Sequence, residues 1–197
     1  MIAFIEGQIS EKNPTYVVLD TGGVGYLLHI SLNTYTRLDG QSRVRLMTHL
    51  YIKEDGHSLY GFWTEEERSL FRHLISVSGI GPNTAQLILS GMQVSEIRGA
   101  IVSGDADTFK RVKGIGAKTA QRIIIDLKDK VEKEGGEISL ISTGKHNTLR
   151  DEALSALVAL GFQKLAVSRT LDKVMKNAAE DMSLEMLIKT VLKELSA

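Results

Sequence analysis

A short glycine motif occurs twice in this chain, and the two copies align without gaps. The first reads VSGIGPNTAQLILS over residues 77–90, and the second reads VKGIGAKTAQRIII over residues 112–125. Each residue of the first copy has its counterpart 35 positions later, so that Gly79 matches Gly114. A single Gly-x-Gly is weak evidence. Two copies with the same Thr-Ala-Gln downstream indicate a duplicated structural unit.

The glycines of this motif allow a tight turn with dihedral angles that other residues avoid. They also let the backbone approach a ligand without an intervening Cβ, at the start of a helix whose N–H groups and partial positive charge suit a phosphate. Ile80 and Ile115, between the glycines, are expected in the core, where they would hold the turn. Small Ala85 and Ala120 would let the two helices of each hairpin pack closely. A plain connector between helices could explain one copy, but it explains the pair poorly.

Positive charge gathers around the second copy, although the formal net charge of the whole chain is zero. Residues 110–122 contain no acidic residue. Lys118 can add an ion pair to the phosphate at the second turn, whereas Asn83 stands in its place in the first copy. The first turn should therefore bind more weakly and mainly through backbone amides. The basic residues of this window are Lys110, Arg111, Lys113, Lys118 and Arg122.

The duplicated motif resembles the helix-hairpin-helix family, whose members grip DNA backbones and do not read the bases. Contacts of this kind position a protein and carry no base code. The resemblance implies two hairpins related by pseudo-symmetry, each holding one strand of a duplex across the minor groove. The candidate DNA-binding residues are Gly79, Ile80, Gly81, Asn83, Thr84, Arg111, Lys113, Gly114, Ile115, Gly116, Lys118, Thr119 and Arg122.

The chain divides into four parts and predicts an α+β, multidomain fold. Residues 1–63 contain short segments rich in Val, Ile, Leu and Tyr between tight turns, which predict an OB-type β-barrel. Residues 64–133 carry helical signals and predict the tandem hairpin domain. Residues 134–148 contain Gly, Ser and Thr with little periodicity, and predict a flexible linker. Residues 149–197 predict a compact unit of three helices.

Composition excludes several kinds of chemistry. Without cysteine, the chain has no disulfide, no thiolate-bound zinc, no iron–sulfur cluster and no cysteine nucleophile. The five histidines are scattered, without the spacing of metal ligands. GIGAKT departs from a nucleotide-binding P-loop, because Ala117 precedes Lys118 where that loop needs glycine. We therefore expect no catalytic residue, no metal and no cofactor.

A helix-hairpin-helix DNA repair enzyme, or an accessory subunit, is the alternative that these patterns leave open. A glycosylase needs an aspartate in a base pocket shortly after the motif. Asp126 and Asp129 follow it, but they alternate with lysines as on a solvated helix face. A nuclease needs a carboxylate cluster that can hold metal. The run Glu65–Glu67 coincides with the start of a predicted helix, where Thr64 and Glu67 form a capping box.

Over its whole length, the chain resembles the RuvA family of bacterial proteins that bind Holliday junctions. The resemblance is carried by GGVGY, by THLYIKEDGHSLYGF, by both glycine motifs with ILSGM after the first, and by ALVALGF. It implies an N-terminal OB-fold barrel, a central tandem helix-hairpin-helix domain and a C-terminal three-helix (UBA-like) domain. It also implies a homotetramer, or an octamer, that holds a four-way DNA junction open and square for branch migration in recombination and repair, independently of sequence.

The resemblance assigns further roles and partners. Glu54 and Asp55, at the tip of a hairpin expected at Asp55-Gly56, correspond to the family's acidic pin, although composition alone favours a solvated turn. Four subunits would bring these carboxylates together and repel phosphates at the junction centre. The C-terminal domain would dock a RuvB-type ring ATPase. Leu160 and Phe162, on either side of Gly161, are candidate docking residues from their apolar character, although they could equally belong to the core. A RuvC-type resolvase is a further expected partner. We expect a cytoplasmic protein with no membrane contact, since no segment is apolar for long enough to span a bilayer.

Overall fold

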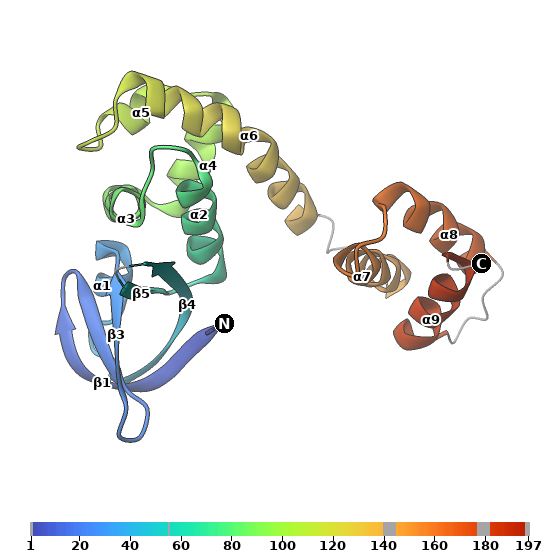
Figure 1. Cartoon of the computed structure of the whole chain (residues 1–197), viewed down its shortest axis with the longest axis horizontal. Helices are drawn as coiled ribbons and strands as arrows, with labels where there is room; N and C mark the ends of the chain where they lie inside the picture. Colours follow the sequence, from blue (N-terminus) through green and yellow to red (C-terminus); the bar gives the residue numbers. More distant parts are fainter. Residues whose placement is uncertain (1, 55, 140–144, 177–181, 196–197) are drawn as a thin grey trace. The chain divides into compact units, whose positions relative to one another are not determined.

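The computed structural model describes residues 2–54, 56–139, 145–176 and 182–195 (Figure 1). The chain forms two compact units, Met1–Gly135 and Gly136–Ala197. A barrel followed by helices makes up the first unit, and helices make up the second, which confirms the predicted α+β fold class. Within the described ranges, none of the helices is long and apolar enough to cross a membrane.

A closed β-barrel forms the N-terminal part of the first unit. Neighbouring strands around the barrel run antiparallel, except β3 and β5, which pair in parallel. The order of strands around the barrel is β1-β2-β3-β5-β4, and this OB-like barrel is the one that the sequence predicts. The strands are β1 (Phe4–Asn13), β2 (Tyr16–Asp20), β3 (Gly25–Ile30), β4 (Arg43–Lys53) and β5 (Gly56–Phe62).

Alternate residues of the strands fill the barrel. Val17 and Leu19 of β2 point into the core, as do Leu28 and Ile30 of β3, with more exposed residues between them. A period of two is what a strand with one buried face requires. The other buried apolar residues of this core are Ile5, Leu38, Val44, Leu46 and Leu59.

Two elements of the barrel were not predicted from the sequence. Strand β1 is held on both sides, by β2 and by β4, and it contains a register shift between Ile9 and Glu11. Helix α1 (Leu32–Arg37) lies between β3 and β4, where only strands were expected. Ser31 caps this helix, because its side chain accepts a hydrogen bond from the N–H of Thr34. Six residues are too few to display a helical period in the sequence.

Five helical segments follow the barrel and share one core with its strand β5. Phe62 of β5 packs against Phe71 of α2, with ring centroids 4.9 Å apart. The same apolar cluster extends to Ile88, Phe109 and Ile123 of the later helices, so that one core holds these helices against the barrel. These segments, counted within the described residues, are α2 (Glu65–Ser76), α3 (Pro82–Gly91), α4 (Val94–Ser103), α5 (Ala106–Lys110) and α6 (Ala117–Ser139).

Helix α2 begins with half of the predicted capping box. Thr64 accepts a hydrogen bond from the N–H of Glu67, as expected. The Glu67 carboxylate does not return to the N–H of Thr64, because it accepts the N–H of Trp63 at 3.1 Å and lies buried against α1. The reciprocal half of the predicted box is therefore wrong.

The second unit contains α7 (Lys145–Ala159), α8 (Lys164–Lys176) and α9 (Leu184–Leu195). Its core is made by apolar residues at helical spacing, and Gly161, with φ of +96°, follows the end of α7 as expected. Ser183 accepts a hydrogen bond from the N–H of Met186 and so caps α9. The fully buried core residues are Ala153, Leu157, Val167, Leu171, Leu187 and Val191.

Helix extends into both ends of the segment that was expected to be a linker, residues 134–148. Helix α6 continues to Ser139, and α7 already begins at Lys145. Residues 140–144 lie outside the described part of the chain. Helix can continue into the two ends because a helix that has already formed gains one hydrogen bond for each residue added. Gly135 and Gly136 lower the helix propensity without ending the helix.

Candidate nucleic-acid interface

The two glycine turns have the same backbone. Gly79 and Gly114 have φ of +93° and +92°, in the region that favours glycine. In each turn, the N–H of the next residue, Ile80 or Ile115, donates to the carbonyl three positions back, at 3.0 and 3.1 Å. The following helix starts with a 3.0 Å hydrogen bond to the carbonyl of the second glycine in both turns. The repeat in the sequence is therefore a repeat in the structure.

The second glycine of each turn is not demanded by the fold. Gly81 has an extended backbone with φ of −89°, and Gly116 also lacks a positive φ. A Cβ built at Gly81 or Gly116 would meet no protein atom within 4 Å. What the missing Cβ leaves is open space in front of a helix N-terminus, which suits the approach of a phosphate. No side chain caps α3, so its first N–H groups are available to such a ligand.

Ile80 and Ile115 anchor the turns. Their side chains are only 5% and 6% exposed, and Ala85 and Ala120 behind them are fully buried. This is the packing that the sequence predicts for the apolar residue between the glycines. Both isoleucines belong to the candidate DNA-binding set, but their buried side chains can serve it only by holding the backbone in place.

The two turns contact each other. A Cβ at Gly79 would lie 3.9 Å from the Oγ1 of Thr119 in the second motif. Arg122 of α6 donates from Nη1 to the carbonyl of Ser78 in the first turn, at 3.4 Å. The starts of α3 and α6 are therefore neighbours, as two hairpins that act on one DNA segment require.

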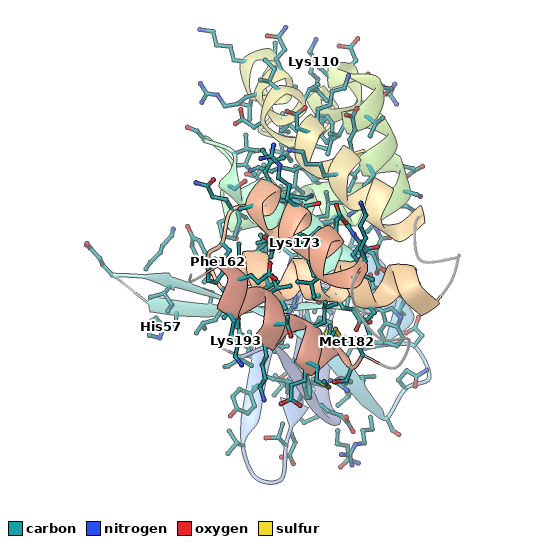
Figure 2. All side chains as sticks on the ribbon, turned by 90° about the vertical axis from the view of Figure 1, so that its right-hand side faces the viewer. His57, Lys110, Phe162, Lys173, Met182 and Lys193 are labelled. Carbon is teal, nitrogen blue, oxygen red and sulfur yellow. The ribbon has the colours of Figure 1, made fainter. Side chains whose placement is uncertain are left out.

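The basic residues around the second turn lie on the surface. Arg111, Lys113, Lys118 and Arg122 all reach solvent. Lys110, at one end of the unit in Figure 2, is engaged with Asp107 through a 2.7 Å ion pair. Apart from that pair and the contact of Arg122 with Ser78, the cationic side chains of this window can turn towards a phosphate close to the second turn.

Asp105 fixes the short helix that leads into the second turn. Its carboxylate accepts hydrogen bonds from Thr108 and from the N–H of Asp107, which caps α5. The hydrogen bonds from Thr108 hold the pKa of this carboxyl below its usual value. Asp105 thus has a structural role, and sequence reasoning did not identify it.

The β4–β5 hairpin extends from the barrel, and His57 marks its outer part in Figure 2. Lys53 pairs with Gly56 across the two strands, and Glu54 follows Lys53 at the turn. Glu54 is exposed at this turn. Asp55, the other expected pin residue, lies outside the described residues. A cavity of about 370 Å³ is lined by this hairpin and by the first glycine turn, through Tyr51, Lys53, Gly56, His57, Ser58, Tyr60, Gly81, Pro82 and Asn83.

The two candidate docking residues of the second unit differ in exposure. Leu160 is 62% exposed, whereas Phe162, labelled in Figure 2, is half-buried and packs against the core of the unit. Two apolar residues that sequence reasoning missed are about as exposed as Leu160: Leu165 at 74% and Met186 at 58%. Leu165 could have been recognised, because it lies off the buried stripe of α8.

The residues considered for a repair enzyme do not form a catalytic cluster. Asp126 and Asp129 are exposed on α6 with lysines close by in the sequence, as on a solvated helix face. Glu65 and Glu66 reach solvent, but Glu67 points into the protein. Within the part of the chain that the structure describes, no group of three or more His, Asp or Glu side chains could hold a metal ion.

Three models of known families match the chain in consecutive segments. The RuvA N terminal domain matches residues 1–61, the SAM-like helix-hairpin-helix tandem matches residues 71–129, and the RuvA C-terminal domain matches residues 148–196. The matched segments follow one another as the barrel, the duplicated turns and the C-terminal helices do.

Curated relatives are similar over nearly the full length of the chain. A protein of Cytophaga hutchinsonii is 46% identical over 197 residues, which cover 98% of this chain and 99% of the relative. Proteins of Christiangramia forsetii and Flavobacterium psychrophilum are 47% and 49% identical over 195 residues, with 99% of this chain and 100% of each relative covered. All three are named Holliday junction branch migration complex subunit RuvA. The chain therefore belongs to the RuvA family.

Proposed function

We propose that this chain binds four-way DNA junctions and serves as the junction-binding subunit of a branch migration complex. The observation that carries the proposal is the pair of matching glycine turns, in contact with each other, in a chain whose relatives bear that name. The chain is the DNA-binding subunit, and the ATPase belongs to its RuvB-type ring partner. Bacterial DNA lies in the cytoplasm, where we accordingly place this function.

The two turns hold DNA through its phosphates. Backbone N–H groups at the starts of α3 and α6 would donate to phosphate oxygens, with Gly81 and Gly116 leaving room for the close approach. Lys113 and Lys118 would add charge around the second turn, and Arg122, which donates to the carbonyl of Ser78, would add charge beside the first turn as well. Phosphate contacts carry no sequence information, so every junction presents the same target. Thr84 and Thr119, in the first turn of each helix, are part of the same proposed contact surface.

Glu54 and Asp55 would act at the centre of the junction. Carboxylates repel phosphates, and a homotetramer would bring the pair together from each of four subunits. Attraction at the outer hairpins and repulsion at the centre favour an open, square junction. We propose the tetramer as the working assembly, and two tetramers could form an octamer. A RuvC-type resolvase is proposed as a further partner.

We propose a division of labour along the chain. Residues 1–63 would supply assembly and the junction core, residues 64–133 would bind DNA, and residues 149–197 would dock the motor, with residues 134–148 as the connection. Leu160, Leu165 and Met186 supply exposed apolar surface for that docking. Phe162 would contribute through its accessible part.

The decisive experiment compares binding to a four-way junction and to a duplex of the same sequence at one fixed salt concentration. We expect clear preference for the junction and no hydrolysis or base excision of either DNA. Equal affinity for the two would contradict the junction function. Cleavage or excision by the pure protein would favour the repair enzyme instead.

The pin is tested by Glu54→Gln combined with Asp55→Asn, which removes the charge and keeps the size of both side chains. Duplex binding should rise and preference for the junction should fall, because repulsion acts at the point where the strands cross. If the preference survives the loss of both charges, these residues form an ordinary solvated turn.

The docking role is tested with a chain that ends at residue 139, the last described residue of α6. This chain retains every residue proposed to contact phosphate, so it should bind junctions as the full chain does. It should fail to stimulate the ATPase and branch migration by the ring partner. Normal branch migration with the shortened chain would rule out the docking role.

A further inference from the structure

Helix α1 of the barrel is hydrogen-bonded to a buried carboxylate of α2. Ser31 donates from Oγ to the Oε1 of Glu67 at 2.6 Å, and Thr34 donates from Oγ1 to the Oε2 at 2.9 Å. The backbone N–H of Trp63 donates to the same Oε2 at 3.1 Å. Ser31 and Thr34 are fully buried, and Glu67 is 5% exposed. The carboxylate is therefore satisfied on both oxygens by donors that belong to the barrel and to its exit.

The other side of α1 reaches the end of α3. Asn33 donates from Nδ2 to the carbonyls of Leu89 and Met92, at 2.6 and 3.0 Å. Its Oδ1 accepts a hydrogen bond from the side chain of Gln93 at 2.9 Å. The N–H of Leu32 donates to the Oγ of Ser90 at 3.1 Å. All of these partners lie at or just beyond the C-terminal end of the helix whose N-terminus forms the first glycine turn.

These contacts complement the apolar core between the barrel and the helices. Apolar packing is non-directional, so it fixes the angle between two layers less sharply than hydrogen bonds do. Hydrogen bonds constrain distance and angle together. Buried polar groups are also unfavourable when they lose their partners, so the arrangement in which Glu67 and Asn33 are satisfied is preferred over tilted alternatives.

The geometry points to Asn33 and Glu67 as positioning residues that fix the first glycine turn relative to the β4–β5 hairpin, and thereby set the preference for four-way junctions over duplex DNA. The inference rests on the proposed function. A duplex needs only the glycine turns. A junction must meet the turns and the end of the hairpin at the same time, so an error in their separation weakens junction binding alone.

The test compares Asn33→Ala and Asn33→Asp with Thr64→Ala in the full-length chain. Asn33→Asp keeps the shape of the side chain but cannot donate to the two carbonyls. Thr64→Ala removes the cap of α2 but none of the side chains that are hydrogen-bonded to α1, so it serves as the control for a general loss of stability. The measurements are Kd for a four-way junction, Kd for a duplex of the same sequence, and Tm.

We expect both Asn33 variants to bind the junction about tenfold more weakly and the duplex within about twofold of the original chain. Thr64→Ala should lower Tm and keep the ratio of the two Kd values. If the ratio of duplex Kd to junction Kd is unchanged in both Asn33 variants, the inference is overturned. It is also overturned if Thr64→Ala lowers this ratio as much as the Asn33 variants do at the same decrease in Tm. Absence of junction preference in the original chain would contradict the proposed function itself, which separates the two failures.

Glu67→Gln provides a second test from the other side of α1. Its amide keeps the size of the carboxyl but replaces one acceptor by a donor, which faces hydroxyl groups that already donate. The preference for the junction should fall as it does for the Asn33 variants. A folded Glu67→Gln protein with an unchanged preference would show that this carboxylate does not position the turn. If the variant does not fold, the Asn33 variants decide.

Discussion

Gly79 and Gly114 turn the chain with φ of +93° and +92°, yet the side chains around the two turns differ in charge. Lys113, Lys118 and Arg122 of the second motif correspond to Ser78, Asn83 and Leu87 of the first. The backbone that can hold a phosphate is present twice, but the surrounding cations are present once. Backbone geometry and electrostatic attraction are therefore separable parts of this interface, and the chain offers an internal control for each.

The first turn, which lacks the cations, lies beside the acidic hairpin. The first turn shares a cavity with the β4–β5 hairpin, which carries Glu54 at its exposed end. Basic residues cluster at the second turn instead. Under the proposed function, strong attraction is kept apart from the acidic hairpin, and the turn beside that hairpin holds phosphate by its amides.

The largest effect is expected where the two turns are most alike. Gly79→Val and Gly114→Val each force a β-branched residue into a positive φ and should lower the free energy of unfolding by about 1–3 kcal/mol. Chemical denaturation should give similar decreases for the two variants. Junction affinity should fall further for Gly114→Val, by about tenfold or more, because the displaced turn is the one with the cations.

Gly116→Ala is the matched control for that pair. Its backbone has no positive φ and a Cβ meets nothing, so stability should stay within about 0.5 kcal/mol of the original. Junction binding should still weaken, because the Cβ enters the space proposed for phosphate. Unchanged binding in Gly116→Ala would mean that no phosphate approaches this turn closely.

Lys118→Ala should weaken junction binding by about 1 kcal/mol without altering sequence preference. The slope of log K against log salt concentration should become shallower by about 0.9 for each phosphate that the lysine no longer neutralises, counted over the subunits engaged. Titrations at several salt concentrations measure both quantities. An unchanged slope would show that Lys118 does not contact phosphate.

Asn83→Lys is the reciprocal change and should have a similar or smaller effect in the opposite direction. A lysine at the first turn should strengthen binding by at most about 1 kcal/mol and make the salt dependence steeper. In combination with Lys118→Ala it should restore much of the affinity. If Asn83→Lys neither strengthens binding nor changes the slope, the first turn does not bind phosphate and the two turns differ in function as well as in charge.

The smallest expected effect is a pH dependence of stability that arises at His49, beside the helix that leads into the first turn. His49 of β4 packs on Phe71 of α2, 5.6 Å between ring centroids, and burial, followed by the positive charges of Arg72 and Arg68, lowers its pKa. The unfolded chain then binds this proton more readily than the folded one. Stability should fall as the pH drops through the ordinary histidine value of about 6.5.

Measurements of stability over a series of pH values test the role of His49 and its expected restriction to the first turn. Between about pH 7.5 and pH 5.5, the decrease in stability should be smaller in His49→Gln than in the original chain. Amide exchange, corrected for its intrinsic pH dependence, should quicken at Ile80 more than at Ile115, because α2 leads into the first turn alone. An equal decrease in His49→Gln would show that other groups cause the acid sensitivity.

Local patterns in the sequence were enough to predict the turns. Gly79, Ile80 and their counterparts lie within a few residues of each other, and their roles follow from short-range geometry. The hydrogen bonds of α1 could not be predicted in this way, because Asn33 and Leu89 are 56 positions apart and Ser31 and Glu67 are 36 apart. Glu67 even fitted a local pattern, the capping box, that its buried contacts override.

The same limit explains the other differences. Strand β1 is held by partners on both sides, which its own residues do not reveal. The helical ends of the segment from 134 to 148 depend on helices that start elsewhere. Leu165 is an exception, since its place beside the buried stripe of α8 was visible in the sequence. Once α8 is known to be a helix, the buried stripe shows that Leu165 must be exposed.

Under the proposed function, holding phosphates by backbone amides has a consequence for the movement of the DNA. The phosphates of a duplex repeat regularly, whatever the bases, so a protein that holds them by N–H groups has nearly the same binding energy before and after the DNA advances by one base pair. No DNA sequence is then bound much more tightly than another. The work of a motor can therefore go into strand exchange, because little of it is needed to release preferred sites. The second glycine of each turn, which the fold itself does not need, would thus admit the phosphates equally well at every position of the moving DNA.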